Sequence, residues 1–378
     1  MKDPDAGVLG VSILEGARFS CQGTGACCSG YVYGPIEDAV VRAVEGHRFT
    51  ENAEHIHGPE GAFEVVDIDG EPTRVLRRVG PRCVFLGADN LCVIHKELGA
   101  RAKPALCRAY PLNVALAPDG VAYVSLNMEC GGFHVGCDGA PLEETLPDDL
   151  PVLLAHPTMV VPEVVRIDGD ITVDFEDALA LEQTWLADLE IDAVGPATLL
   201  RALAVRMVRP QDGPAITPAR GWAPANAHPI VTALVPWAEE ERQVALAEGN
   251  LVDVELHRRV GVAAEAWLAE QAPRGTPGLQ AGDAGDRLTR LHLQNVIFGK
   301  ALHKAPTLMA GLGLEVVKLD LAMRLALLLA GEAPVTPAEV NEGLRTLNRC
   351  LRPSGLASLG DEVVECCERV VRALADEA

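Results

Sequence analysis

Residues 20–35 read SCQGTGACCSGYVYGP and place three cysteines within eight positions. Cys27 and Cys28 are adjacent, and glycines stand at positions 23, 25 and 30. Glycine tolerates backbone angles that let a loop wrap closely around a bound group. Adjacent side chains diverge in an extended backbone, so both thiols reach one centre only if the loop bends. This stretch is therefore a candidate wall of a metal site.

Cysteine is unusually dense in the N-terminal third of the chain. Eight of the eleven cysteines lie in the first 137 residues. The first twenty residues lack a basic segment followed by an apolar core, which argues against a secretory signal and favours the cytoplasm. In a reducing compartment, cysteines at this density indicate metal binding or catalysis more than disulfides.

The bulk composition excludes several classes of partner. The chain has 378 residues, is 48% hydrophobic and carries a formal net charge of −22. It is long enough to bury ordinary cores in two or three domains, and its charge predicts no nucleic-acid or anionic-membrane partner. The apolar segment 311–330 contains Glu315, Lys318, Asp320 and Arg324, so we expect a core helix there and not a membrane span.

Hydrophobic periodicity predicts an α+β chain in two parts. We expect a small cysteine-rich metal-binding domain with short β-hairpins over residues 1–140 and a predominantly helical domain with an initial hairpin over 141–378. Alternation and turn residues predict hairpins at 63–79, 112–127 and 162–175. Helical spacing predicts helices at 36–46, 93–99, 175–190, 195–208, 227–248, 250–271, 286–303, 311–331, 336–350 and 360–376.

The spacing of the N-terminal cysteines favours an iron–sulfur cluster over a zinc finger. They stand at positions 21, 27, 28, 83, 92, 107, 130 and 137, without the paired C-x2-C knuckles of structural zinc sites. Thiolates spread over several loops are typical of iron–sulfur ligation, whose spacings vary. The alternative for any one of them is a small apolar core residue. That alternative is the favoured one for the helical Cys350, Cys366 and Cys367.

A basic segment accompanies these cysteines. Between Arg74 and Arg108 the sequence has eight Lys or Arg against two acidic residues, which predicts an anionic cluster or ligand nearby or else a solvated basic face. His95 and His134 stand near cysteines and remain open as ligands, as does Cys137. The tyrosines Tyr31, Tyr33 and Tyr110 either pack or take part in proton transfer.

Three segments together carry a family resemblance: CQGTGACCSG (21–30), CVFLGADNLCVIHKELG (83–99) and ALCRAYP (105–111). Their order resembles the YkgJ-type cysteine-cluster family, a zinc- or iron-chelating domain, over about residues 18–135. Within it, the last two segments are similar to flagellin lysine N-methylases.

The resemblance implies an iron–sulfur cluster of the 4Fe–4S type, or zinc or iron, and S-adenosylmethionine as methyl donor for lysines of a protein such as flagellin. The ligands it implies are Cys21, Cys27, Cys28, Cys83, Cys92, Cys107 and Cys130. Arg108 is a candidate to hold the donor's carboxylate, and Tyr110 is a second cofactor-binding candidate.

Two functions therefore stay open. The first is an iron–sulfur protein that methylates protein lysines. The second is a non-catalytic zinc- or iron-binding module for metal handling or for binding a protein partner. The sequence predicts neither the number of metal centres nor the oligomeric state.

Overall fold

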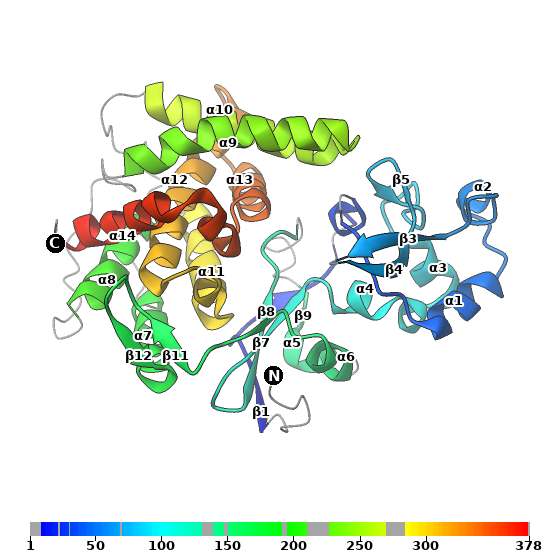
Figure 1. Cartoon of the computed structure of the whole chain (residues 1–378), viewed down its shortest axis with the longest axis horizontal. Coiled ribbons are helices and arrows are strands. Elements are labelled where there is room, and N and C mark those ends of the chain that lie inside the picture. Colours follow the sequence, from blue (N-terminus) through cyan, green and yellow to red (C-terminus); the bar gives the residue numbers. More distant parts are fainter. Residues whose placement is uncertain are drawn as a thin grey trace.

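The chain is a mixed α+β protein that is rich in helices and has several small sheets. The computed structural model describes residues 9–21, 23–29, 31–68, 70–130, 139–146, 150–190, 195–209, 227–269 and 284–376. Figure 1 shows a cysteine-rich lobe, residues 26–109, at the right and a helical part, residues 175–376, at the left. A small sheet lies between them. The predicted mixed fold class is confirmed at this level.

The cysteine-rich lobe is built from short elements around its own core. Its predicted hairpin is confirmed as the antiparallel pair β3 (Phe63–Ile68) and β4 (Glu71–Leu76). Its core gathers apolar side chains from α1, the β4 strand and α3, among them Val44, Leu76 and Ile94. The remaining elements are η1 (Ala26–Cys28), α1 (Asp38–Glu45), α2 (Ala53–Ile56), β5 (Arg78–Val79), β6 (Arg82–Cys83), α3 (Val93–Leu98), η2 (Ala100–Ala102) and α4 (Ala105–Ala109).

The central sheet joins the two halves of the chain. Its order is β1 (Gly10–Ile13), β8 (Val121–Leu126), β7 (Leu112–Leu116) and β10 (Met159–Val160). The hairpin predicted at 112–127 is the antiparallel pair β7–β8, and β1 and β10 add to it in parallel. Close by, β2 (Arg18–Phe19) pairs with β9 (Ala140–Pro141), and α5 (Leu142–Thr145) and α6 (Leu150–Ala155) follow. Strands from both sides of residue 140 thus lie in one sheet, and the division at that residue stays a prediction.

The helical part follows the predicted pattern closely, because its helices bury long amphipathic or apolar faces. The predicted third hairpin is β11 (Val164–Arg166) with β12 (Thr172–Asp174). The helices are α7 (Phe175–Leu189), α8 (Pro196–Val208), α9 (His228–Ala247), α10 (Leu251–Ala269), α11 (Ala284–Phe298), α12 (Leu308–Ala330), α13 (Pro337–Cys350) and α14 (Asp361–Asp376), with 3-10 turns η6 (Ala301–Lys304) and η7 (Pro353–Leu359).

One predicted helix end is wrong. The helix expected to run to residue 303 ends at Phe298, and a 3-10 turn follows. Gly299 packs against β8 so tightly that a Cβ there would stand 2.3 Å from Ser125 Oγ. Lys300 then takes a positive φ of 59°, which an α-helix does not allow. This tertiary contact overrides the helical periodicity of the sequence.

The α12 helix is the expected core helix. It is buried along almost its whole length, and its charged side chains have polar partners inside the protein. Glu315 accepts from Lys318 and lies 2.9 Å from His292 Nε2, and Asp320 accepts from Arg324 at 3.3 Å. Among the helices that the structure describes, none has the length and apolar character to cross a membrane.

The buried His292–Glu315 contact predicts a loss of stability in mild acid. Burial lowers the pKa of His292, while the charge of Lys318 and the bond from His292 hold the pKa of Glu315 at about 2 against the opposing effect of burial. Both groups therefore favour the folded state above their unfolded pKa values, about 6.5 and about 4.3, and this contribution is lost as the pH falls below them. Each contributes a slope of at most about 1.4 kcal/mol per pH unit.

Urea denaturation at pH 7, 6 and 5 measures this slope. We expect the free energy of unfolding to decrease as the pH is lowered from 7 to 5. In His292→Gln, we expect the plot of this free energy against pH to be flatter between pH 6.5 and 5. A curve of unchanged steepness in that variant would assign the acid sensitivity to other groups.

Candidate metal centre

All seven cysteines proposed as ligands line one cavity of about 550 Å³. They come from the loop before η1, from η1 itself, from β6, from the residue preceding α3, from α4 and from the segment after β8. Sequence-distant loops therefore converge on a single space, as the metal hypothesis requires. The other lining residues are Phe19, Thr24, Gly25, Tyr33, Leu76, Asn90, Leu91, Ile94, His95, Lys96, Lys103, Pro104, Tyr110 and Pro111.

The first cysteine loop bends sharply, and the bend aligns its two adjacent thiols. Gly25 takes a positive φ of 67° immediately before η1, a region that favours glycine. A Cβ at Gly25 would also stand 3.1 Å from Asn90 Oδ1, so this glycine lets the loop approach the turn that precedes Cys92. Within η1 the sulfurs of Cys27 and Cys28 lie 3.6 Å apart. The bend required for both thiols to face one centre is therefore present.

Four of the seven thiols, Cys27, Cys28, Cys83 and Cys107, have pKa values that other thiols of the cavity help to shift, and Cys92 acts on three of them; we call these five the thiol core. The hydrogen bond with Cys27 and burial raise the pKa of Cys28, and negative charge on Cys27, Cys83 and Cys92 adds to the rise. Burial raises the pKa of Cys107, and charge on Cys83, Cys92 and Cys27 adds to that rise. The two remaining thiols lie at the edge of this group. Cys21 is exposed, and Cys130 is buried next to Tyr110.

Three thiols of the core, Cys28, Cys83 and Cys107, are neutral unless a cation is present, because their pKa values are raised. Burial raises the pKa of Cys83 to about 12 and that of Cys107 well above its usual range. Cys27 is the exception, because a hydrogen bond from Cys28 lowers its pKa to about 7 and the charge of Lys103 assists. A bound metal would supply the positive charge that lets such thiols bind as thiolates. The donor chemistry of the cavity thus fits a thiophilic metal group.

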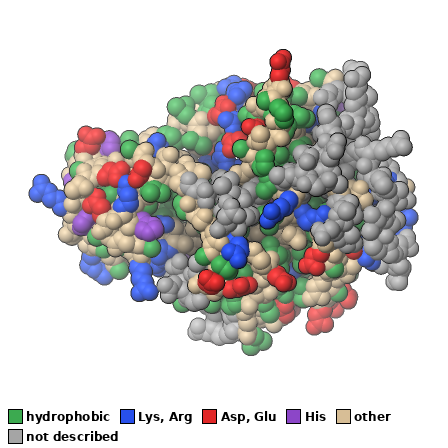
Figure 2. All heavy atoms as spheres, turned by 180° about the vertical axis from the view of Figure 1, so that it is seen from behind, with side chains coloured by type: hydrophobic (Ala, Val, Ile, Leu, Met, Phe, Trp, Pro, Cys, Tyr) green, Lys and Arg blue, Asp and Glu red, His purple; other side chains and the backbone are tan. Residues whose placement is uncertain are grey.

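Several basic side chains of the segment 74–108 form ion pairs with acidic side chains of the same lobe. Arg74 pairs with Asp38 at 3.1 Å, Arg77 pairs with Glu60 at 2.9 Å, and Lys96 lies 3.0 Å from Asp89. On the face in Figure 2, basic and acidic side chains are mixed over this lobe. These ion pairs favour the second interpretation of the basic segment, a solvated basic face, over a patch that binds an anion.

Lys103 is a basic residue that acts on the thiols, and sequence reasoning did not single it out. It lines the cavity, its charge helps to lower the pKa of Cys27, and it opposes the rise that burial causes in the pKa of Cys107. Arg108 instead donates a hydrogen bond through Nη1 to the Arg101 carbonyl oxygen at 2.8 Å and is not one of the lining residues. Its assignment to a donor carboxylate stays a prediction.

Three tyrosines separate the cavity from the helical part. Tyr33 and Tyr110 line the cavity, and the ring centroid of Tyr31 lies 6.1 Å and 6.0 Å from theirs. Tyr33 donates its hydroxyl to the Cys27 carbonyl oxygen at 2.7 Å, which helps to fix the η1 turn. On the other side, the Arg349 guanidinium lies 4.4 Å from the Tyr31 ring centroid. The helical part therefore covers the tyrosine side of the site.

Some predicted ligands remain open. His95 lines the cavity but is exposed, and Cys137 and His134 lie outside the described residues. Within the described ranges, no group of three or more His, Cys, Asp or Glu side chains has an arrangement that could hold a metal ion. The metal-binding nature of this lobe is therefore still a prediction.

Comparison with known proteins adds no assignment: no family model, no curated protein and no solved structure matches the chain.

Proposed function

We propose that the cavity binds an iron–sulfur cluster through the thiol core. The observation that carries this proposal is the convergence of seven cysteines from separated segments on one cavity. A cluster of the 4Fe–4S type uses four thiolates, and the thiol core supplies five. Cys21 and Cys130 are additional donors at its edge.

The size and charge of the cavity support a polynuclear group over a single ion. A structural zinc ion needs four ligands at about 2 Å, whereas the cavity of about 550 Å³ has the size of an organic-ligand pocket. A thiolate-ligated cluster is a bulky anion, so a positive charge in the cavity wall would stabilise it. Lys103 supplies such a charge beside Cys27 and Cys107.

A bound cluster would supply electron transfer or an iron site for a ligand. The protein's own residues would hold and shield it. The apolar side chains of Phe19, Leu76 and Ile94 lie in the lining and limit the access of water, and burial keeps the hydroxyls of Tyr33 and Tyr110 protonated by raising their pKa values.

Metal analysis after anaerobic purification tests the proposal. We expect brown protein with iron and acid-labile sulfide in equal amounts, about four of each per chain. Colourless protein with zinc and no sulfide would support the alternative, a non-catalytic zinc module. Protein that takes up neither metal under reducing conditions would contradict both.

A second candidate is a cluster-containing methyltransferase that acts on protein lysines with S-adenosylmethionine. It is favoured by the apolar and aromatic part of the cavity wall, which leaves room for an organic group beside the thiols, and by the resemblance of 83–111 to flagellin lysine N-methylases. In this reaction the neutral amine forms a bond to the methyl carbon, the sulfur–methyl bond breaks to leave a thioether, and the amine proton passes to a base.

Incubation of metal-loaded protein with methyl-labelled donor tests the methyltransferase candidate, with flagellin and with a cell lysate as acceptors. We expect label in methylated lysine after acid hydrolysis. Metal-loaded protein that binds no donor and transfers no label would leave the metal proposal intact and rule out this activity.

A further inference from the structure

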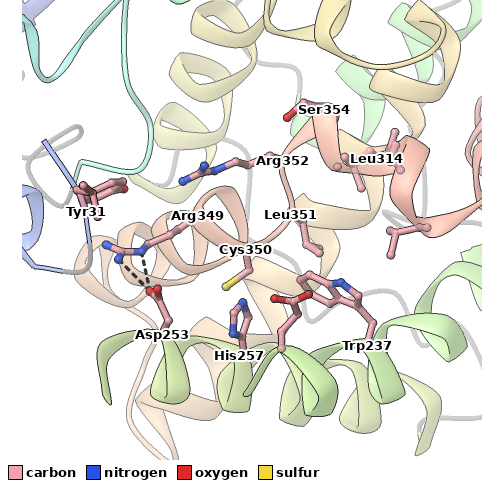
Figure 3. Close-up of a pocket in the computed structure, with 15 residues that line it drawn as sticks. Tyr31, Trp237, Asp253, His257, Leu314, Arg349, Cys350, Leu351, Arg352 and Ser354 are labelled. Atoms are coloured by element: carbon pink, nitrogen blue, oxygen red, sulfur yellow. Dashed lines mark hydrogen bonds and ion pairs between the residues drawn. The ribbon is translucent and has the colours of Figure 1, made fainter. Parts of the chain in front are cut away.

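A second cavity, of about 510 Å³, lies in the helical part where it meets the cysteine-rich lobe. Its walls are α9, α10, the end of α13 and the η7 turn, and Tyr31 approaches from the other lobe (Figure 3). We call it the Trp237 pocket. Its lining is Tyr31, Val32, Trp237, Glu241, Asp253, His257, Leu314, Arg349, Cys350, Leu351, Arg352, Ser354, Gly355, Leu356 and Leu359.

Both arginines of the Trp237 pocket form ion pairs with acidic side chains. Arg349 is buried and contacts Asp253 Oδ1 through Nε at 3.1 Å and Nη2 at 2.9 Å, and Nη2 also lies 3.2 Å from the Ser29 carbonyl oxygen. Arg352 binds Glu129 through two bonds of 2.9 Å. Each guanidinium is therefore paired with a carboxylate, which weakens the attraction of this pocket for an anionic ligand.

The groups that remain for a ligand are an acid, an imidazole nitrogen and an aromatic ring. In the described part of the chain, the Glu241 carboxylate makes no hydrogen bond or ion pair, and buried His257 Nδ1 has no hydrogen-bond partner. The Trp237 ring stands edge-on to the His257 ring, with 5.6 Å between centroids. Burial lowers the pKa of His257, although Asp253 and Glu241 oppose the shift. This favours the neutral imidazole, which has one acceptor nitrogen.

We propose that the Trp237 pocket binds a primary alkylammonium group. An ammonium has three N–H donors and no acceptor, which matches the Glu241 carboxylate and the His257 nitrogen. Its charge is also attracted by the face of an indole ring, and Leu314 and Leu356 line the pocket where an alkyl chain would lie. The source of the amine is a lysine side chain of another protein or a free alkylamine. This inference does not depend on a metal in the other cavity.

Calorimetry on the purified full chain tests the pocket with two amines, n-butylamine and Nα-acetyl-lysine methylamide. The matched uncharged probes are n-butanol and Nα-acetyl-norleucine methylamide. We expect at least one amine to bind and both uncharged probes to bind at least about tenfold more weakly, because a charged hydrogen bond is lost. Binding of the lysine derivative alone identifies a protein source, and binding of butylamine alone identifies a free amine.

Two substitutions on α9 provide the matched comparison. Glu241→Gln should weaken amine binding about tenfold or more, whereas Glu240→Gln, at the exposed neighbouring position, should leave it unchanged. Far-ultraviolet circular dichroism and metal content confirm that each variant is folded. If neither amine binds the wild-type protein, or if the two variants bind equally, the inference is wrong, whatever the metal analysis shows.

Discussion

Replacing Cys83 with serine is expected to remove most of the bound metal and to destabilise the cysteine-rich lobe. Cys83 is 8% exposed. Burial raises its pKa and negative charge on Cys92 and Cys27 adds to the rise, so it lies inside the thiol core. A serine hydroxyl is a poor ligand for a metal that prefers soft thiolates. Because the binding free energy of a structural metal is also folding free energy, we expect metal content to fall about tenfold or more and the lobe to lose several kcal/mol of stability.

Iron, sulfide and zinc analysis of anaerobically purified protein measures this effect, together with thermal unfolding. Cys21→Ser is the graded comparison, because Cys21 is exposed and lies outside the thiol core; its effect should be smaller. Cys366→Ala is the control, since Cys366 is on α14, where it accepts from Arg369. Full metal content in Cys83→Ser, or an equal loss in Cys366→Ala, would contradict the assignment.

Glu182→Gln is expected to cost about 3–5 kcal/mol of stability, because it leaves a buried lysine charge without its partner. Glu182 on α7 accepts from Lys300 Nζ and lies 2.8 Å from His303 Nε2. All three side chains are at most 2% exposed. Lys300 Nζ also lies 4.2 Å from the ring centroid of Tyr123 on β8. This network therefore ties α7 and η6 to the central sheet.

Chemical denaturation of three variants apportions that loss. The double variant Glu182→Gln with Lys300→Met removes both charges, and we expect it to be more stable than Glu182→Gln alone. Glu239→Gln, which breaks an exposed pair with Arg242, should have little effect. A Glu182→Gln protein as stable as Glu239→Gln would show that the buried network does not hold these elements together.

Local patterns predicted the elements well because their causes are local. The hairpin at 63–79 follows from alternating side chains and a turn glycine with a φ of 85°, and α13 follows from apolar spacing with Thr336 as its N-cap. These features depend on neighbours a few residues away. The cysteine set was likewise visible, since its density stands out against the whole chain.

The parts that escaped prediction depend on contacts between distant residues. Lys103 is one of eight basic residues in its segment, and only folding shows that its charge lies where it affects the thiols. The end of α11 at Phe298 depends on the approach of β8. The Trp237 pocket forms where Tyr31 contacts Arg349. Hydrophobic periodicity and motif spacing do not relate residues so far apart in the sequence.

The most direct test of a shared metal core is cysteine alkylation of the anaerobic metal-loaded protein, read residue by residue by mass spectrometry. We predict that at least four of the five thiols Cys27, Cys28, Cys83, Cys92 and Cys107 are protected together and become reactive together when a chelator removes the metal. If the five thiols react in the loaded protein at rates that metal removal does not change, they do not share a metal, and the proposed centre is wrong.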